Sequence, residues 1–392
     1  MIRIEKKSKC SGCYACAASC PKKCIKLKVD AEGFWYPDVD ESLCINCGAC
    51  EKVCPILAPS KKQSDWNITT YATMHNEDSI RLASSSGGVF SALAGYVLDQ
   101  GGVVFGASFD SDLNVEHKYI ECIEDLEFLR GSKYVQSKIG DAYCRAEAFL
   151  KAGRLVLFSG TPCQIEGLLS YLKRPYENLI TQDLICHGVP SPAVWQKYID
   201  YLSTSFDGTK PVCVSFRSKT NGWKNYYISI IFGNGKEYSA SKDTDPMMQA
   251  FLKNLCLRPS CYECAFKTKS RRSDITLADF WGVSSISPDL DDDKGTSLVI
   301  IQSEKGAKVF DKIRDIIYAK ETDPDLSTFY NSSIIKSPKE PKKRAVFMRA
   351  VSAENFAEIQ KKYSKPTMSE KVKSFLIRAL GKVKRMVFKK PK

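Results

Sequence analysis

The sequence of 392 residues contains only three histidines and no apolar run of eighteen residues. Few histidines leave little choice for an imidazole acid or base. Without a long apolar run, we expect no membrane-spanning helix. The chain also has no Walker sequence and no GxGxxG fingerprint, so neither of these two nucleotide-binding loops is predicted.

The net charge of +13 is concentrated at one end of the sequence, because residues 361–392 contain twelve Lys and Arg and one acidic residue, Glu370. The remainder is nearly neutral, and no nucleic-acid-binding module accompanies the charge, so we expect no nucleic-acid partner. Apolar residues in 361–392 recur at three- and four-residue steps, which predicts a basic amphipathic helix. Such a helix would lie on an anionic membrane surface, dock on an acidic partner or extend into solvent.

Eight of the seventeen cysteines form two copies of the pattern CxxCxxCxxxCP. In this pattern the first three thiolates bind one [4Fe-4S] cluster, and the fourth binds the other cluster of the pair. The spacing therefore predicts two clusters. One would be held by Cys10, Cys13, Cys16 and Cys54, and the other by Cys44, Cys47, Cys50 and Cys20.

Zinc and disulfide bonds are the alternatives for these cysteines. Zinc sites usually pair two CxxC units across a longer loop, and disulfide frameworks belong to small secreted domains. Residues 1–9 are short and basic with no apolar run of signal-peptide length behind them, so we expect reduced thiols in the cytoplasm. Cys24 lies outside both copies and is expected to be a buried thiol beside Ile25.

The chain is long enough for two or three domains. Residues 58–67 are polar and contain a proline, which predicts a linker. Beyond it, apolar strands alternate with amphipathic helices, as in a mixed α/β domain. We therefore expect an α+β ferredoxin-like module over residues 1–60, a mixed α/β domain over 68–355 and the basic amphipathic helix over 361–392.

Two loops in the α/β part have the composition of an anion cradle. Small residues at 84–88 and at 159–164 each precede a predicted helix. Small residues let the backbone approach an anion, and unpaired amides at a helix start point towards it. A helix cap without a ligand is the alternative in both places.

A third group of cysteines is suggested by Cys261 and Cys264, which form a CxxC pair. Two thiolates cannot hold a [4Fe-4S] cluster, so other ligands would be needed. Cys163 and Cys186 are favoured because each follows a predicted buried strand, where the strand ends meet at one edge of a sheet. Cys256 is the next candidate, and we expect the remaining three to be buried thiols, namely Cys122, Cys144 and Cys213.

Together these motifs resemble one family, the coenzyme F-420 hydrogenase/dehydrogenase beta-subunit proteins, here with an N-terminal two-cluster ferredoxin module. The stretches that carry the resemblance cover most of residues 70–300. They are SSSGGVFSAL at 84–93, GSKYVQSKIG at 131–140, GTPCQIEGL at 160–168, DLICHGVPSP at 183–192 and RPSCYECAFKTKSRRSDITLADFWG at 258–282.

The resemblance implies a flavin-binding α/β domain whose FAD exchanges a hydride with a deazaflavin and passes single electrons to iron–sulfur clusters. It implies a third [4Fe-4S] cluster on Cys163, Cys186, Cys261 and Cys264. It also implies flavin-binding residues in two stretches, with Thr161 as a further candidate. These residues are Ser85, Ser86, Gly87 and Gly88 for the phosphates or ribityl chain, and Lys133, Tyr134 and Gln136 for the isoalloxazine.

His187 and Lys133 are the candidate catalytic residues. His187 directly follows Cys186 and would donate a proton to the substrate or flavin, or else support the neighbouring cluster. Lys133 would lie beside the isoalloxazine. Lys269, Arg271 and Arg272 would stabilise the reduced flavin or remain solvated.

The predicted function is therefore an iron–sulfur flavoprotein oxidoreductase that couples FAD chemistry to one-electron transfer. The alternative is an electron-transfer relay subunit with no substrate of its own, serving a partner reductase, for example in an envelope polysaccharide pathway. The expected redox partner is a deazaflavin, a ferredoxin or that partner reductase. The expected location is the cytoplasm, with peripheral attachment to the inner face of the membrane through the basic helix.

Overall fold

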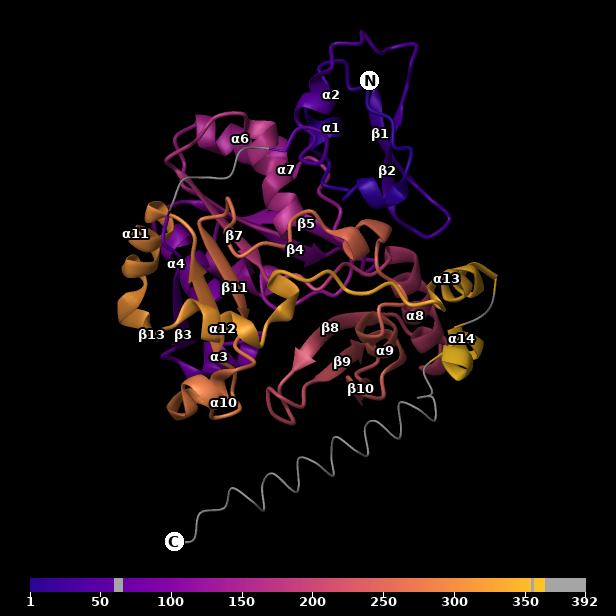
Figure 1. Ribbon diagram of the computed structural model, residues 1–392. Helices are drawn as coiled ribbons and strands as arrows, with labels where there is room; N and C mark the ends of the chain where they lie inside the picture. The colour runs from indigo at the N-terminus through magenta and orange to yellow at the C-terminus, as the bar shows by residue number, and fades with distance from the viewer. Residues whose placement is uncertain (60–65, 354–355, 364–392) are drawn as a thin grey trace, which may run out of the picture.

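The computed structural model describes residues 1–59, 66–353 and 356–363. A small N-terminal module sits on a larger α/β body, and a separate three-stranded sheet with its helices lies beside the main sheet (Figure 1). Among the described residues, no helix is both long and apolar enough to cross a bilayer.

The N-terminal module consists of one β-hairpin and short helices: η1 (Lys7–Lys9), α1 (Ala15–Ala18), β1 (Ile25–Val29), β2 (Trp35–Val39) and α2 (Ala49–Lys52). The hairpin turn packs against the body. Glu32 forms a salt bridge with Arg344 (2.7 Å), and the carbonyl oxygen of Glu32 accepts a hydrogen bond from the Ser191 hydroxyl. Gly33 has a positive φ of 84°, and a Cβ there would collide with Ala193.

The body is built on an eight-stranded mixed sheet in the order β13-β3-β12-β11-β7-β6-β4-β5. The four strands β4, β6, β7 and β11 run parallel, so their carboxyl ends share one edge. The other pairings are antiparallel. The strands are β3 (Thr69–His75), β4 (Val103–Phe109), β5 (Val115–Ile120), β6 (Val156–Ser159), β7 (Leu179–Leu184), β11 (Ile275–Asp279), β12 (Ser297–Ile301) and β13 (Ile317–Thr322).

Helices cover both faces of this sheet. The core with α4 and α11 contains Leu93, Val97 and Phe310, and the core with α6 and α7 contains Tyr143 and Leu168. Tyr14 of the N-terminal module joins the second core, so the module packs on that face. The helices of the body up to this sheet's end are α3 (Asp78–Ala83), α4 (Val89–Asp99), α5 (Leu126–Leu129), α6 (Ala142–Lys151), α7 (Pro162–Leu172), α10 (Val283–Ile286), α11 (Glu304–Lys312) and α12 (Pro324–Phe329), with η2 (Ile123–Asp125), η4 (Pro288–Leu290), η5 (Arg314–Ile316) and η6 (Ser332–Ile334).

The smaller sheet, in the order β10-β9-β8, shares an apolar core with the helices beside it. Trp195, Phe216 and Met248 are fully buried there. Its elements are α8 (Pro192–Ser205), β8 (Pro211–Ser218), β9 (Tyr227–Phe232), β10 (Glu237–Ser241), α9 (Pro246–Leu252), η3 (Pro259–Glu263), α13 (Arg344–Ala353) and α14 (Phe356–Tyr363).

The mixed α/β architecture is confirmed, with strands at 103–109 and 227–232 and a helix at 89–99 where the sequence pattern predicts them. Strands β3, β5 and β13 were not predicted. The boundaries 1–60, 68–355 and 361–392 stay predictions. The proposed linker at 58–67 lies partly outside the described residues, as does the basic tail beyond residue 363.

Candidate functional site

The first set of predicted cluster ligands, here called the inner group, consists of Cys10, Cys13, Cys16 and Cys54. Three of the four are buried, with Cys10 half-buried. Their sulfurs are close enough to act on one another, because both Cys10 and Cys54 help to raise the pKa of the Cys13 thiol. The inner group faces the body, since a Cβ on Gly167 of α7 would lie 2.9 Å from the Cβ of Cys13.

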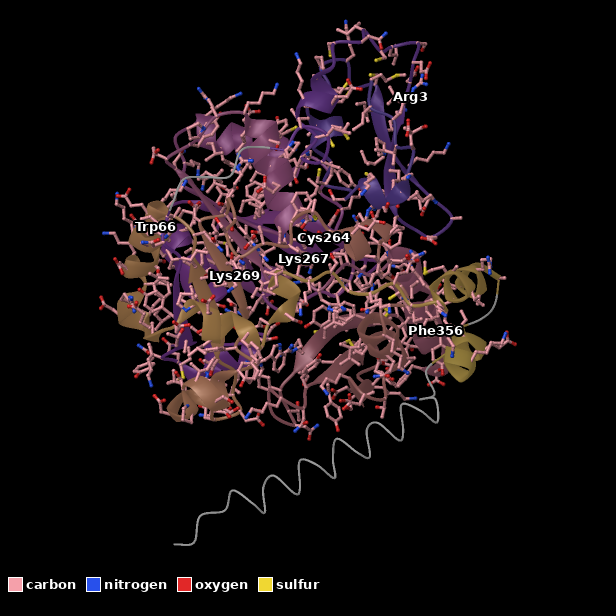
Figure 2. All side chains as sticks on the ribbon, viewed as in Figure 1. Arg3, Trp66, Cys264, Lys267, Lys269 and Phe356 are labelled. Atoms are coloured by element: carbon pink, nitrogen blue, oxygen red, sulfur yellow. The ribbon has the colours of Figure 1, made fainter. Side chains whose placement is uncertain are left out.

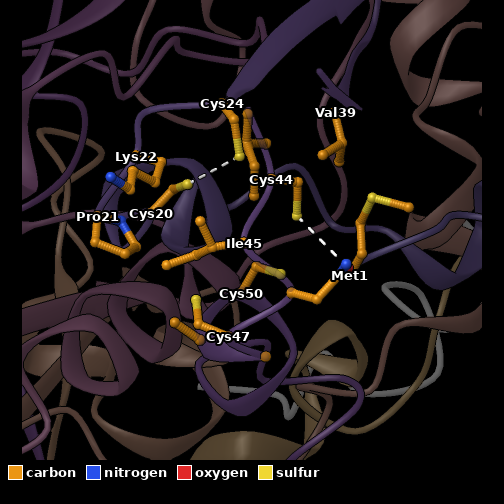
Figure 3. A pocket seen from close by; sticks show the side chains of 14 residues that line it. Met1, Cys20, Pro21, Lys22, Cys24, Val39, Cys44, Ile45, Cys47 and Cys50 are labelled. Atoms are coloured by element: carbon orange, nitrogen blue, oxygen red, sulfur yellow. Dashed lines mark hydrogen bonds between the residues drawn. The ribbon is translucent and has the colours of Figure 1, made fainter. Parts of the chain in front are cut away.

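The second set, here called the outer group, consists of Cys20, Cys44, Cys47 and Cys50. All four line one cavity in the N-terminal module (Figure 3). Cys47 is exposed, Cys20 and Cys44 are half-buried, and the amide of Ile2 donates to the Cys50 sulfur (3.3 Å). The fourth cysteine of each copy thus joins the other copy's set, which is the crossed arrangement that the spacing predicts.

Cys24 is buried, as its sequence position suggested, but it is not an isolated apolar residue. Its sulfur lies 3.3 Å from that of Cys20, and it lines the cavity of the outer group (Figure 3). Cys256 is buried in the core beside the small sheet. The expectation of three further buried thiols was wrong, because each lies on an exposed face of its element: Cys122, Cys144 and Cys213.

The third set, here called the body group, consists of Cys163, Cys186, Cys261 and Cys264. These residues line one cavity although they come from three segments of the chain. Cys163 lies in the first turn of α7, directly after β6, and Cys186 follows β7 by two residues. These two strands are parallel neighbours, and η3 brings the CxxC pair to the same edge. Cys264 and Lys267 lie close to one another in the centre of the molecule (Figure 2).

The chemistry of the three sets fits iron–sulfur clusters. Burial raises the pKa of Cys13 to about 12, that of Cys261 to about 12 and that of Cys186 to about 11. Thiolates at such positions are stable only beside a metal centre that neutralises them. In the part of the chain that the structure describes, no three histidine, cysteine or carboxylate side chains form a site for a single metal ion.

Two cations adjoin the body group. Lys267 donates to the carbonyl oxygen of Cys186 and to that of Ser333. Arg271 lines the cavity and pairs with buried Asp183 (3.0 Å), while its buried Nη2 has no hydrogen-bond partner among the described residues. A cluster in this cavity would provide sulfur acceptors for that unpaired group.

A separate cleft of about 560 Å³ lies between the end of α5 and strand β8. Its walls include Ser85, Arg130, Lys133, Arg217 and Lys219. Its volume lies in the range of small-molecule sites, and its lining is cationic. The buried Nε of Arg217 has no hydrogen-bond partner in the described part of the protein. The volume, the charge and this unpaired donor fit a ligand with phosphate groups, such as FAD.

The predicted flavin loop contributes only partly to this cleft. Ser85 lines it, and the Ser85 hydroxyl also accepts from the amide of Ser132 (2.6 Å). The Ser86 hydroxyl instead donates to the carbonyl of Thr296. A Cβ on Gly87 would lie 2.4 Å from the Thr73 carbonyl oxygen, and Gly88 caps α4 with a φ of 91°. The two glycines therefore have a structural explanation in packing and backbone conformation.

The stretch 131–140 runs from the cleft towards the inner group. Lys133 lines the cleft, and the Tyr134 hydroxyl accepts from Arg217 (3.3 Å). Gln136 is buried away from the cleft and accepts a hydrogen bond from Arg258 (3.1 Å). Thr161 caps α7, and its hydroxyl lies 3.2 Å from the Cys163 sulfur, so it adjoins the body group.

The two candidate catalytic residues line different cavities. His187 lies in the wall of the body-group cavity, and both ring nitrogens have partners: Nε2 contacts Asn254 (2.6 Å) and Nδ1 contacts Ser333 (3.5 Å). Burial lowers the pKa of His187, which favours a neutral ring held by Asn254. This environment suits a supporting role beside Cys186 better than proton donation in the cleft.

Two lysines of the cleft have unusual electrostatics. Burial lowers the pKa of Lys133 to about 7 and that of Lys219 to about 7. Each ammonium donates to three backbone carbonyls, and the acceptors of Lys219 include Ser86. A bound anion would favour the charged form of both.

The sequence analysis missed most of the cationic wall, namely Arg130, Arg217 and Lys219. Arg217 forms a two-pronged ion pair with Asp279 at the end of β11 (2.8 and 3.2 Å), so the end of β8 is fixed over the sheet edge. The only signal in the sequence was a pair of cations at the end of a predicted strand. In contrast, Lys269, Arg271 and Arg272 pair with carboxylates outside the cleft.

Comparison with known families identifies two segments. Residues 153–326 match the family described as the C terminus of the coenzyme F420 hydrogenase/dehydrogenase beta subunit. Residues 9–58 match the 4Fe-4S dicluster domain, which contains the inner and outer groups.

Similar proteins include two from methanogens. The F subunit of the F(420)H(2) dehydrogenase of Methanosarcina mazei is 24% identical over 91% of this chain and 93% of its own length. The coenzyme F420-dependent sulfite reductase of Methanocaldococcus jannaschii is 25% identical over 76% of this chain, which spans 45% of that protein. A chain of the F420-reducing [NiFe] hydrogenase complex from Methanosarcina barkeri, 18% identical with a TM-score of 0.45 over 75% of this chain and 90% of its own, is too loose a match to support an inference.

Proposed function

Because residues 153–326 belong to the family of coenzyme F420 hydrogenase/dehydrogenase beta subunits and residues 9–58 form a 4Fe-4S dicluster domain, we propose that this protein is an FAD-dependent iron–sulfur oxidoreductase. Its general role is electron transfer through iron–sulfur clusters. The proposal adds a third [4Fe-4S] cluster on the body group and an FAD in the cationic cleft.

The observation that carries the proposal is the convergence of the body group at the carboxyl edge of the parallel strands. Four cysteines from three segments line one cavity there. The inner group lies where the N-terminal module packs on the body, and the outer group has an exposed cysteine. The three groups therefore form a route from the protein surface to the body, as a chain of one-electron centres requires.

In the cleft, Arg217 and Lys219 would hold the phosphates of FAD, and Ser85 would contribute a hydroxyl donor. Lys133 would lie beside the reactive ring and hold a positive charge there when protonated. Asp279 keeps the guanidinium of Arg217 in place by two hydrogen bonds. Bound FAD would supply two-electron hydride exchange on one side and one-electron exchange with clusters on the other.

The relatives' names indicate the hydride carrier. Both the F(420)H(2) dehydrogenase and the coenzyme F420-dependent sulfite reductase are named for F420 chemistry. We propose a deazaflavin of this type as the two-electron partner, and a ferredoxin or a partner reductase as the one-electron partner. Both exchanges would take place in the cytoplasm.

Anaerobic purification tests the cofactor content. We expect about twelve iron atoms, as much acid-labile sulfide and one FAD per chain. About eight iron atoms would remove the third cluster from the proposal. Full iron without FAD would favour the relay subunit with no substrate of its own, and protein with neither iron nor sulfide would contradict the whole proposal.

Stopped-flow reduction then tests the partners. The anaerobic protein is mixed in parallel with reduced F420, reduced ferredoxin and NADH, and flavin and cluster absorption are followed separately. Reduced F420 should reduce the flavin before the clusters, and ferredoxin should reduce the clusters first. The reverse order for either donor would contradict the proposed route.

The domain boundaries 1–60, 68–355 and 361–392 remain part of the proposal, as does membrane contact through the basic tail. Flotation with anionic liposomes tests the tail. We expect the full chain to float and a chain ending at residue 360 to remain in solution. Equal flotation of the two would contradict membrane contact through this segment.

A further inference from the structure

Arg258 is completely buried between the N-terminal module and the body. Its guanidinium donates to the carbonyl oxygens of Cys10 (2.8 Å) and Trp35 (2.9 Å) and to Gln136 (3.1 Å). The Nη2 atom also lies 3.6 Å from the sulfur of Cys10, a member of the inner group. All these partners are formally neutral apart from that sulfur.

No carboxylate among the described residues forms an ion pair with Arg258, although two lie on the neighbouring hairpin. Asp30 pairs with Lys7 (2.5 Å), and Glu32 pairs with Arg344 (2.7 Å). An isolated charge in a protein interior is strongly unfavourable unless an opposite charge compensates it. Arginine does not lose its proton in this environment, so the compensating charge must come from the sulfur side.

The surroundings are shaped to hold this cation. Gly12 has a positive φ of 68°, and a Cβ there would lie 2.9 Å from the guanidinium carbon and 2.6 Å from Gln136. The rings of Tyr36 and Phe34 lie 4.3 and 5.5 Å from the guanidinium carbon. Aromatic faces favour a desolvated cation. The backbone of Arg258 also belongs to the body-group segment, because its carbonyl accepts from the amide of Cys261 (2.9 Å).

We propose that Arg258 is a positioning residue that compensates the negative charge of the cluster on the inner group and raises its reduction potential. The inference rests on the proposed function, because it requires that the inner group holds a cluster. One-electron reduction, with the electron supplied by the reduced carrier, adds one negative charge to that cluster. A fixed cation at hydrogen-bonding distance from a ligand sulfur stabilises the reduced form more than the oxidised form.

The test is a redox titration followed by EPR on the anaerobic full chain and three variants. Arg258→Gln removes the charge, Arg258→Lys keeps it, and Arg344→Gln is the matched control. Arg344 is also a buried arginine that joins the hairpin to the body, but it pairs with Glu32 and has no cysteine sulfur among its hydrogen-bond partners in the described residues. Iron and acid-labile sulfide are measured on every sample.

In Arg258→Gln, the midpoint potential of one cluster should fall by about 59 mV or more, which is a tenfold loss in its equilibrium constant for one-electron reduction. Arg258→Lys should show a clearly smaller fall, and Arg344→Gln none. Unchanged midpoints in Arg258→Gln with full iron would overturn the inference and leave the proposed function intact. Wild-type protein without iron or sulfide would instead remove the proposed function.

A second measurement avoids dependence on the stability of Arg258→Gln. Protein containing arginine with ¹⁵N in the guanidinium is reduced and studied by pulsed EPR. A ¹⁵N coupling to a reduced cluster should appear in the wild type and should weaken or vanish in Arg258→Lys. A coupling that is identical in the two proteins would overturn the inference.

Discussion

The inner and outer groups have the same sequence pattern but different surroundings. In both, the backbone has positive φ at the same two steps of the pattern: Gly12 and Asn46 at the first, Tyr14 and Gly48 at the second. The inner group is then covered by α7 and contacted by Arg258, whereas Cys47 of the outer group is exposed.

Each group also has a donor near one ligand sulfur, and the donors differ in charge. The inner group has the guanidinium of Arg258, and the outer group has the thiol of Cys24 beside Cys20. The local pattern therefore sets the geometry of ligand binding, while residues far away in the sequence set the electrostatics. This comparison can be tested at four points.

Loss of one ligand from each group should produce the largest effect. Cys13→Ala and Cys47→Ala should each reduce iron content by about a third. Either change should stop reduction of the flavin by ferredoxin and spare its reduction by reduced F420. Only Cys13→Ala should also lower the melting temperature substantially, because Cys13 packs against α7. Equal melting temperatures in the two variants would show that the inner group does not hold the interface together.

Exchanging the residues at equivalent positions should give the next largest effect. Gly12→Asn should lower the free energy of unfolding by about 1–3 kcal/mol, since a side chain there collides with Arg258 and Gln136. Asn46→Gly should change it by about 0.5 kcal/mol or less. Denaturant titration of the cluster-loaded proteins measures both values. Similar losses in both variants would contradict the asymmetry.

The pH dependence of FAD binding should separate the cleft from both cysteine groups. The ammonium groups of Lys133 and Lys219 have pKa values of about 7, so FAD affinity should fall as pH rises above 7, by up to about tenfold per pH unit for each charge lost. The free energy of unfolding of the FAD-free protein should change oppositely. Between pH 7 and about 10, the unfolded chain binds more protons at these lysines, so their contribution to stability rises with pH.

Equilibrium dialysis with FAD and iron analysis at pH 6, 7, 8 and 9 check this prediction. Iron content should stay constant over the same range, because no cysteine among the described residues lines the cleft. An FAD affinity that is constant or that rises with pH would contradict a role for these two lysines.

Removing the thiol of Cys24 should have the smallest effect. Cys24→Ala should keep all the iron and lower the reduction potential of the outer cluster by less than Arg258→Gln lowers that of the inner one. A neutral donor contributes less than a charged one to a sulfur acceptor. Redox titration compares the two shifts directly, and loss of iron in Cys24→Ala would instead identify Cys24 as a ligand.

The sequence was most informative where the chemistry depends on residues close together in the chain. The spacing of the two copies led to the crossed sets of four, which the structure also brings together. Cys163 and Cys186 could be paired with the CxxC segment because parallel strands bring their carboxyl ends to one edge. In each case a short segment or a general rule of sheet topology was enough.

The sequence was least informative where distant segments meet. Arg258 reaches Cys10 across 248 positions of the chain, and the cationic wall combines the end of α5 with the end of β8. Strand β3 was missed because its buried positions include Thr70 and Thr73, and β13 because half of its residues are exposed. Cys144 and Cys213 lie in apolar patterns, yet each is on the outer face of its element.

The hairpin turn has a consequence for how charge moves through the molecule. Glu32 is tied to α13 and to the start of α8, and Gly33 fits against Ala193 with no room for a side chain. The small module is thus held in place and cannot swing between donor and acceptor as a tethered carrier does. Transfer must occur by tunnelling across a fixed gap, so its rate should be insensitive to solvent viscosity.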